Sequence, residues 1–182
     1  MTELDRLASE IGVSGRTLRR AGERETIRCT RRSPRAVTVS AREYEYVRSH
    51  WKLLERALQV LRTRPGVRLA VLFGSVARGD ADASSDVDVL VRIRGGWREH
   101  AETALALEAA LSRPVQLIPL DHAPALLLED VLREGRVLAD RDGDWARLKR
   151  RSRSIARAAR DEGVRLEQAA WDTLDRFAEL VA

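Results

Sequence analysis

Two aspartates in an apolar segment are the residues of this chain best suited to chemistry. Asp86 and Asp88 stand in the run SDVDVLVRI, where Val87 and Val89 alternate with them. Alternate side chains of a β-strand point to one face, so both carboxylates lie on one side while the valines enter the core. Because neighbouring carboxylates repel each other, a hard divalent cation such as Mg²⁺ would stabilise the pair. A solvated surface pair is the alternative.

A glycine-serine turn precedes the two aspartates. Gly74 and Ser75 directly follow the apolar segment 67–73 and open a short helical turn. Free backbone N–H groups of such a turn can hold a phosphate, and glycine lets the main chain approach it closely. The Ser75 hydroxyl adds a donor, and Arg78 can reach a phosphate or a nearby carboxylate. Together the two segments predict a site for a nucleoside triphosphate and a metal ion.

The elements that position these residues form an α/β domain. Alternation and apolar runs predict strands at 67–73, 86–93, 115–120 and 136–139, and apolar spacing predicts helices at 97–111 and 124–134. The break Arg64-Pro65-Gly66 marks a domain boundary. We therefore expect a small mixed sheet within a domain at 65–142, followed by C-terminal helices at 143–182.

This domain resembles the minimal nucleotidyltransferases of the polymerase-β-like superfamily. The resemblance covers about Val67 to Asp142 and rests on Gly74-Ser75-x-x-Arg78-Gly79 and, five residues later, Ser85-Asp86-x-Asp88-Val89. It implies that two Mg²⁺ ions assist the transfer of a nucleoside monophosphate from an NTP to a hydroxyl acceptor. It also implies that Asp86 and Asp88 are catalytic and bind metal, and that the nucleotide is bound by Gly74, Ser75, Arg78 and Ser85.

One position departs from the family's pattern. The family carries a third metal-binding carboxylate in a valine-aspartate-leucine strand, whereas this chain has Gln116 there. A neutral amide offers a metal one carbonyl oxygen, but it carries no charge and is a poor general base. Asp121 lies five residues further on, so it can replace the missing carboxylate only if the chain turns after Pro119.

Two functions therefore remain open. One is a Mg²⁺-dependent nucleotidyltransferase coupled to a DNA-binding module. The other is a catalytically weakened or inactive nucleotidyltransferase domain in a DNA-binding transcriptional regulator or an antitoxin-like protein, with a toxin-like protein as partner. The carboxylate pair and the glycine-serine turn favour the first function, whereas Gln116 and the arginine-rich N-terminal hairpin favour the second.

The first forty residues predict a winged helix-turn-helix. Apolar spacing indicates one helix at 4–11 and a second, capped by Ser14, that runs to Ala21, and alternation then indicates a hairpin over 26–39. A net charge of +5 favours a polyanionic partner. In a DNA complex the contacts would come from Arg16, Arg19, Arg20, Arg31, Arg32 and Arg35. A solvated helical hairpin without a ligand is the alternative.

A long linking helix at 41–64 is expected to follow. Ser40 and Glu43 match a capping box, in which each side chain accepts a hydrogen bond from a backbone N–H at the helix start. The apolar stripe of this helix, which includes Val47, Trp51 and Leu54, must be covered. Packing against the two flanking domains or a homodimer seam would cover it.

The C-terminal region and the overall composition complete the prediction. Four arginines at helical spacing form either a solvated face or a contact for phosphate or an acidic partner: Arg150, Arg153, Arg157 and Arg160. The apolar stripe of the last helix, from Leu166 to Leu180, either folds back onto the sheet or docks a partner. The absence of a long apolar run and of a signal peptide, with a single cysteine, predicts a cytoplasmic protein.

Overall fold

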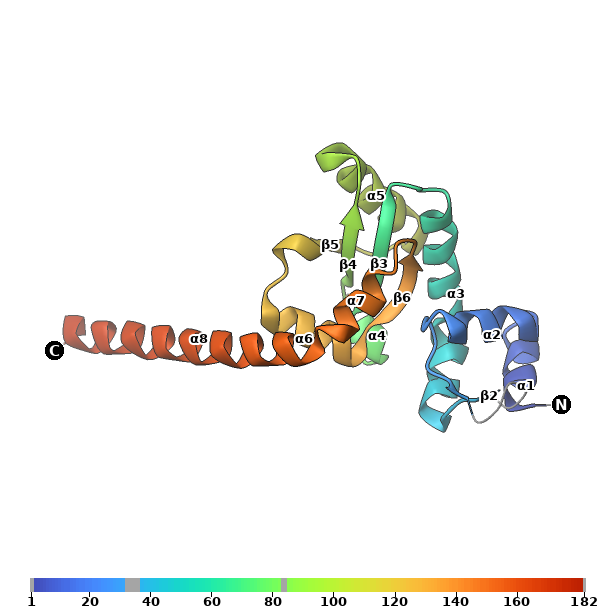
Figure 1. Ribbon diagram of the computed structural model, residues 1–182, viewed down its shortest axis with the longest axis horizontal. Helices are drawn as coiled ribbons and strands as arrows, with labels where there is room; N and C mark the ends of the chain where they lie inside the picture. The colour runs from blue at the N-terminus through green and yellow to red at the C-terminus, as the bar shows by residue number, and fades with distance from the viewer. Residues whose placement is uncertain (1, 32–36, 83–84, 182) are drawn as a thin grey trace.

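A four-stranded mixed sheet forms the centre of the computed structural model, which describes residues 2–31, 37–82 and 85–181 (Figure 1). The strands are β3 (Val67–Phe73), β4 (Val87–Ile93), β5 (Val115–Pro119) and β6 (Arg136–Asp140), and they lie in the order β5-β4-β3-β6. β3 is antiparallel to β4 and to β6, and β5 is parallel to β4. The expected mixed α/β fold is therefore present.

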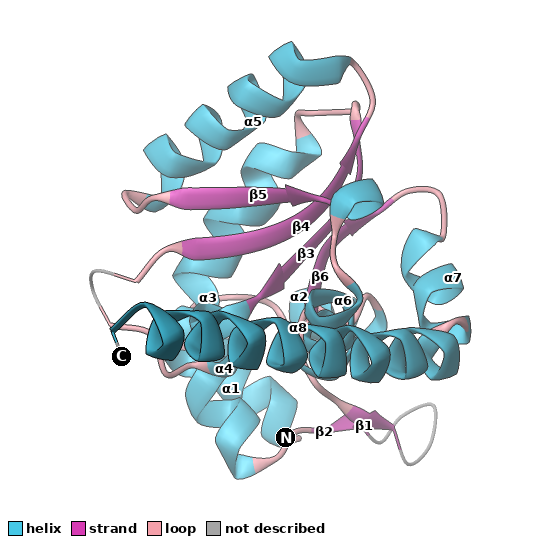
Figure 2. Cartoon of the chain, turned by 90° about the vertical axis from the view of Figure 1, so that its left-hand side faces the viewer, coloured by secondary structure: helices cyan, strands magenta, loops and turns pink. Residues whose placement is uncertain are grey.

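Helices cover both faces of the sheet (Figure 2). On one face, α3 (Ala41–Arg62) and α5 (Gly96–Leu111) pack on a core that includes Val87 and Val89. On the other face, α6 (Ala125–Glu134), α7 (Asp144–Arg150) and the start of α8 (Ser152–Val181) pack on a core that includes Leu90. A five-residue helix, α4 (Gly74–Arg78), connects β3 to the loop before β4.

Two short helices and a small hairpin precede α3. They are α1 (Glu3–Glu10), α2 (Gly15–Glu23), β1 (Thr30–Arg31) and β2 (Val37–Thr38). The hairpin is shorter than expected because the segment before it bonds to the central sheet instead. The backbone N–H of Val137 on β6 donates to the carbonyl of Glu25, and the Thr26 hydroxyl donates to the Val137 carbonyl. Arg32 and Arg35, assigned to the hairpin turn, lie outside the described residues.

The start of α3 differs from the expected capping box. The Ser40 hydroxyl accepts a hydrogen bond from the Glu43 N–H at 3.2 Å, as expected. The Glu43 carboxylate, however, does not accept a hydrogen bond from the backbone N–H of Ser40. It accepts from the backbone N–H of Arg28 and forms an ion pair with Arg136, with 2.6 Å between Oε1 and Nη1. Arg136 is fully buried. Leaving a buried guanidinium without a carboxylate partner costs more free energy than leaving one N–H uncapped at a helix start.

The apolar stripe of α3 is covered within the chain. Val47, Trp51, Leu54 and Leu61 are each at most 3% exposed. They belong to one continuous core that extends from α1 and α2 to the sheet, and α3 packs against α5, β6 and α1. Cover by the flanking parts of the chain, one of the two arrangements expected, is therefore observed.

Helix α8 leaves the body of the molecule after its first turns (Figure 1). Ile155 and Ala159 are buried, whereas Val164, Leu166 and Trp171 are about 60% exposed. The described part of the apolar stripe therefore does not fold back onto the sheet. Among the described residues, no helix is both long and apolar enough to cross a membrane.

Candidate functional site

The carboxylate pair lies at the start of β4, on the face of the sheet that α6 covers. Val87 and Val89 are buried on the opposite face, and Asp88 shares its side of the strand with Leu90. Asp86 directly precedes β4 and is exposed, whereas Asp88 is half-buried. Partial burial, and then the charge of Asp86, raise the pKa of the Asp88 carboxyl. The negative charge of Asp86 therefore disfavours ionisation of Asp88.

The glycine-serine turn lies directly against Asp88. The antiparallel register places Phe73, the last residue of β3, opposite Asp88, so α4 begins beside the carboxylate. Gly74 has a φ of +73°, and a Cβ at this position would lie 2.5 Å from Asp88 Oδ2. Glycine is required here both for the backbone conformation and for the close approach of the carboxylate.

Glu134, at the end of α6, holds this turn in place. Its Oε1 accepts a hydrogen bond from the Gly74 N–H at 2.9 Å, and both of its oxygens accept from Arg78 Nη1. Arg78 also donates from Nε to Asp80 Oδ2 at 3.0 Å. Of the two partners expected for Arg78, a phosphate or a carboxylate, the structure places carboxylates beside it. Sequence reasoning assigned no role to Glu134, which lies 60 residues from Gly74.

The two serines of the motif have different surroundings. The Ser85 hydroxyl donates to Asp82 Oδ1 and accepts from the Asp82 N–H, both at 3.0 Å, so Ser85 closes the loop before Asp86. The Ser75 carbonyl accepts the N–H groups of Gly79 and Asp80. Within the part of the chain that the structure describes, the Ser75 hydroxyl has no hydrogen-bond partner. It is therefore available to a ligand.

Gln116 lies beside Asp88, whereas Asp121 does not. The parallel register of β4 and β5 pairs Asp88 with Gln116, and both side chains stand on the same face of the sheet. The chain does turn after Pro119, into a 3₁₀ helix at Leu120–His122, but the Asp121 carboxylate lies 4.0 Å from Arg92 Nη2, toward the other end of β4. The described residues contain no group of three His, Cys, Asp or Glu side chains suited to a metal.

The arginines of the N-terminal region lie apart from this site. Arg19 pairs with Asp5 at 2.6 Å and Arg31 pairs with Glu23 at 3.3 Å. Arg16 and Arg20 line a separate pocket between α2 and α3. The structure therefore gathers Gly74, Ser75, Asp86, Asp88 and Gln116 into one site and leaves the α2 arginines elsewhere.

Replacing Asp88 by asparagine is expected to raise the melting temperature in metal-free buffer at neutral pH. Because the pKa of Asp88 is raised above the ordinary value of 3.8, the native state holds its proton more tightly than the unfolded chain does. The wild type therefore loses stability as pH rises through the window above that value. Melting curves of both proteins between about pH 3 and pH 8 should diverge as pH increases.

A matched variant tests whether the effect belongs to the carboxylate pair. Asp121→Asn removes an exposed carboxylate outside the pair and should leave the melting temperature nearly unchanged. Equal melting temperatures for Asp88→Asn and the wild type at neutral pH would show that the folded surroundings of Asp88 do not raise its pKa.

Comparisons with known proteins show what the part of the chain that contains this site is similar to. Residues 55–144 match the family described as Polymerase beta, Nucleotidyltransferase. A toxin–antitoxin crystal structure with AMP-PNP shares 26% sequence identity, with a TM-score of 0.52, over 66% of this chain and 97% of the other. A mutant of the toxin–antitoxin pair MntA-HpeT has the same TM-score and coverage at 24% identity, and it shows the fold alone.

A further solved structure, described as that of a minimal nucleotidyltransferase, is 38% identical over 50% of this chain and 91% of the other, with a TM-score of 0.38. The curated proteins include no match to this sequence.

Proposed function

We propose that the protein transfers a nucleoside monophosphate from an NTP to a hydroxyl acceptor with Mg²⁺, because residues 55–144 match the family described as Polymerase beta, Nucleotidyltransferase. The observation that carries the proposal is the close approach of the Asp88 carboxylate to the Gly74 turn, beside a second carboxylate, Asp86, that raises the pKa of Asp88. The similarity to a toxin–antitoxin structure with AMP-PNP supports a nucleotide as the ligand.

The donor set at this site fits Mg²⁺. Asp86 and Asp88 offer carboxylate oxygens, and Gln116 offers a neutral amide oxygen in register with Asp88. Hard cations take such oxygen ligands and complete their coordination with water and phosphate. The repulsion between the two carboxylates is relieved when a cation binds. Mg²⁺ would neutralise the charge of the triphosphate and favour loss of a proton from the acceptor hydroxyl.

The residues around the pair would orient the substrate. The acceptor oxygen forms a bond to the α-phosphorus, the bond from that phosphorus to the β-phosphate oxygen breaks, and pyrophosphate leaves. We assign phosphate binding to the free Ser75 hydroxyl and to the α4 turn. Glu134 and Arg78 are positioning residues, because their contacts hold the Gly74 turn against Asp88.

Replacing Gly74 by alanine is expected to weaken Mg²⁺-dependent NTP binding by at least about tenfold, because the added methyl group displaces the Asp88 carboxylate. Isothermal titration calorimetry measures the loss. Gly96→Ala is the matched control: Gly96 has a similar φ of +71° but nothing within 4 Å of an added Cβ. Both variants should lose about 1 kcal/mol of stability from backbone strain, and equal losses of NTP affinity would contradict the contact.

Incubation of the purified protein with α-labelled NTPs and Mg²⁺ tests the proposal. Label should pass to the protein itself or to a component of a lysate, and Asp86→Asn should lower the labelling rate by at least about a hundredfold. An absence of transfer with every NTP, in the wild type and with all acceptors tried, would overturn the enzymatic proposal.

A second candidate is a catalytically weakened domain in an antitoxin-like protein. Gln116 in place of a carboxylate favours this candidate, as does the exposed apolar part of α8, which no described residue covers. The similar toxin–antitoxin structure supports a toxin-like protein as the partner. A toxin-like partner should form a complex with the full chain that Trp171→Glu disrupts and Arg153→Glu does not. An unchanged complex with Trp171→Glu would remove α8 from the interface.

We also propose that α2 contacts DNA. Arg16 and Arg20 are exposed and form no ion pair with any described residue, whereas Arg19 and Arg31 are already paired. Binding of the full chain to duplex DNA should decrease steeply with salt, and Arg16→Ala should weaken it more than Arg98→Ala, which changes an exposed arginine on α5.

A further inference from the structure

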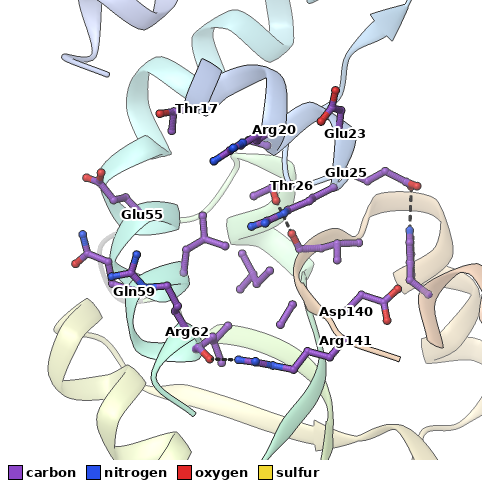
Figure 3. Close-up of a pocket in the computed structure, with 18 of the residues that line it drawn as sticks. Thr17, Arg20, Glu23, Glu25, Thr26, Glu55, Gln59, Arg62, Asp140 and Arg141 are labelled. Atoms are coloured by element: carbon purple, nitrogen blue, oxygen red, sulfur yellow. Dashed lines mark hydrogen bonds between the residues drawn. The ribbon is translucent and has the colours of Figure 1, made fainter. Parts of the chain in front are cut away.

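A large cleft lies between the N-terminal helices and the nucleotidyltransferase domain. Its volume is about 840 Å³, and its walls come from α2, from the second half of α3, from β6 and from α7 (Figure 3). None of Gly74, Ser75, Asp86, Asp88 and Gln116 lines it. The cleft is thus separate from the site described above. Its size falls within the range of about 300–1000 Å³ typical of small-molecule sites.

The cleft carries uncompensated positive charge. Six basic and four acidic side chains line it. Two of the acids already have cationic partners, since Glu25 pairs with Lys149 and Glu23 with Arg31, which lies outside the lining. Within the described part of the chain, the side chains of four lining arginines form neither an ion pair nor a hydrogen bond: Arg16, Arg20, Arg24 and Arg62. Figure 3 shows that Arg20 comes from α2 and Arg62 from α3.

The remaining lining is suited to a ligand that also has an apolar part. Leu58, Leu61 and Trp145 contribute apolar atoms. Trp51, which is 3% exposed, also belongs to the lining, and its indole Nε1 has no hydrogen-bond partner among the described residues. A buried donor without a partner is costly unless a ligand or water satisfies it.

We propose that this cleft binds a phosphorylated small molecule of nucleotide size. Guanidinium groups bind phosphate oxygens through charge-assisted, often bidentate hydrogen bonds, and unpaired arginines on two walls can bind one polyphosphate between them. A DNA duplex does not fit into a cleft of this volume. The ligand would contact α2 and the nucleotidyltransferase domain together, and it would occupy Arg16 and Arg20, the residues proposed above to contact DNA.

Calorimetric titration of the full-length protein with ATP and with pyrophosphate, in EDTA, tests this proposal. EDTA removes the divalent cation on which NTP binding beside Asp88 depends, so the result is independent of the proposed transfer reaction. Both compounds should bind at one site. Arg20→Glu and Arg62→Glu, one from each wall, should each weaken binding by about tenfold or more.

Matched variants separate this site from general charge effects and from misfolding. Arg153→Glu makes the same charge change at an exposed residue of α8 outside the cleft, and it should bind ATP like the wild type. If Arg20→Glu or Arg62→Glu unfolds the protein, Arg20→Gln and Arg62→Gln replace them in the titration. These neutral variants should also weaken the binding of ATP and pyrophosphate. The proposal fails if neither compound binds in EDTA, or if Arg153→Glu weakens binding as much as the two cleft variants do.

Discussion

The Gln116→Asp variant is expected to transfer nucleotide at least about a hundredfold faster than the wild type. Gln116 is paired in register with Asp88 on the neighbouring parallel strand, and both side chains are on one face. An aspartate there would add a third negative charge beside Asp86 and Asp88, together with a group able to accept the proton of an acceptor hydroxyl. Labelling with α-labelled NTPs and Mg²⁺, measured as initial rates, shows the gain.

Gln116→Asn is the control for this gain. Asparagine has nearly the shape of aspartate but stays neutral, so it should leave the labelling rate at or below that of the wild type. A wild type that already labels as fast as Gln116→Asp would show that two carboxylates suffice. If neither protein transfers label while both still bind NTP, the antitoxin-like candidate is the better description.

Replacing Arg136 by methionine is expected to lower the free energy of unfolding by about 3–5 kcal/mol. Arg136 is 1% exposed, and its guanidinium donates to both oxygens of Glu43 at 2.6 and 3.0 Å. It also lies 3.4 Å from the centre of the Tyr46 ring. Without Arg136, the Glu43 carboxylate stays buried and keeps the backbone N–H of Arg28 as its only donor among the described residues. Urea denaturation measures the loss.

Arg19→Met provides a control at the surface with the same shortest N–O distance. The Arg19–Asp5 pair has the same 2.6 Å separation as Arg136–Glu43, but its side chains are 48% and 33% exposed. Its loss should cost less than about 1 kcal/mol. The double variant Arg136→Met/Glu43→Leu should recover part of the stability, because no buried charge remains. Similar losses for Arg136→Met and Arg19→Met would contradict the role of burial.

The buried pair also connects the N-terminal helices to the proposed active site. Arg136 Nε donates to the Ala77 carbonyl on α4 at 2.7 Å, and Arg28 donates to the carbonyl of Glu134, the residue that holds Gly74. A change in the position of the N-terminal region would therefore be transmitted to the Gly74 turn through Arg136, Arg28 and Glu134.

The elements and the faces of the strands could be predicted from the sequence. The expected helix at 97–111 and strand at 67–73 match α5 and β3 closely. The alternation of Asp88 with Val87 and Val89 correctly placed the valines in the core. Such predictions succeed because periodicity and local hydrogen bonding depend on residues close together in the chain.

The partners of the charged side chains could not be predicted. Glu43 has the spacing of a capping residue, but it pairs with Arg136, 93 residues away. Glu134 holds Gly74 across 60 residues, and no local pattern indicates that contact. Arg16 and Arg20 were expected on a helix that contacts DNA, and they also line a cleft whose walls come from α2, α3 and β6.

The sequence alone therefore determined which residues could form a metal and nucleotide site and on which side of the strand they stand. Only the tertiary structure decided which carboxylate pairs with which arginine. It also decided that Gln116 lies beside Asp88 and that arginines with unpaired side chains line one cleft. The reason is physical: a side chain's face follows from backbone geometry over a few residues, whereas charge pairing is set by burial and by contacts between segments that packing brings together.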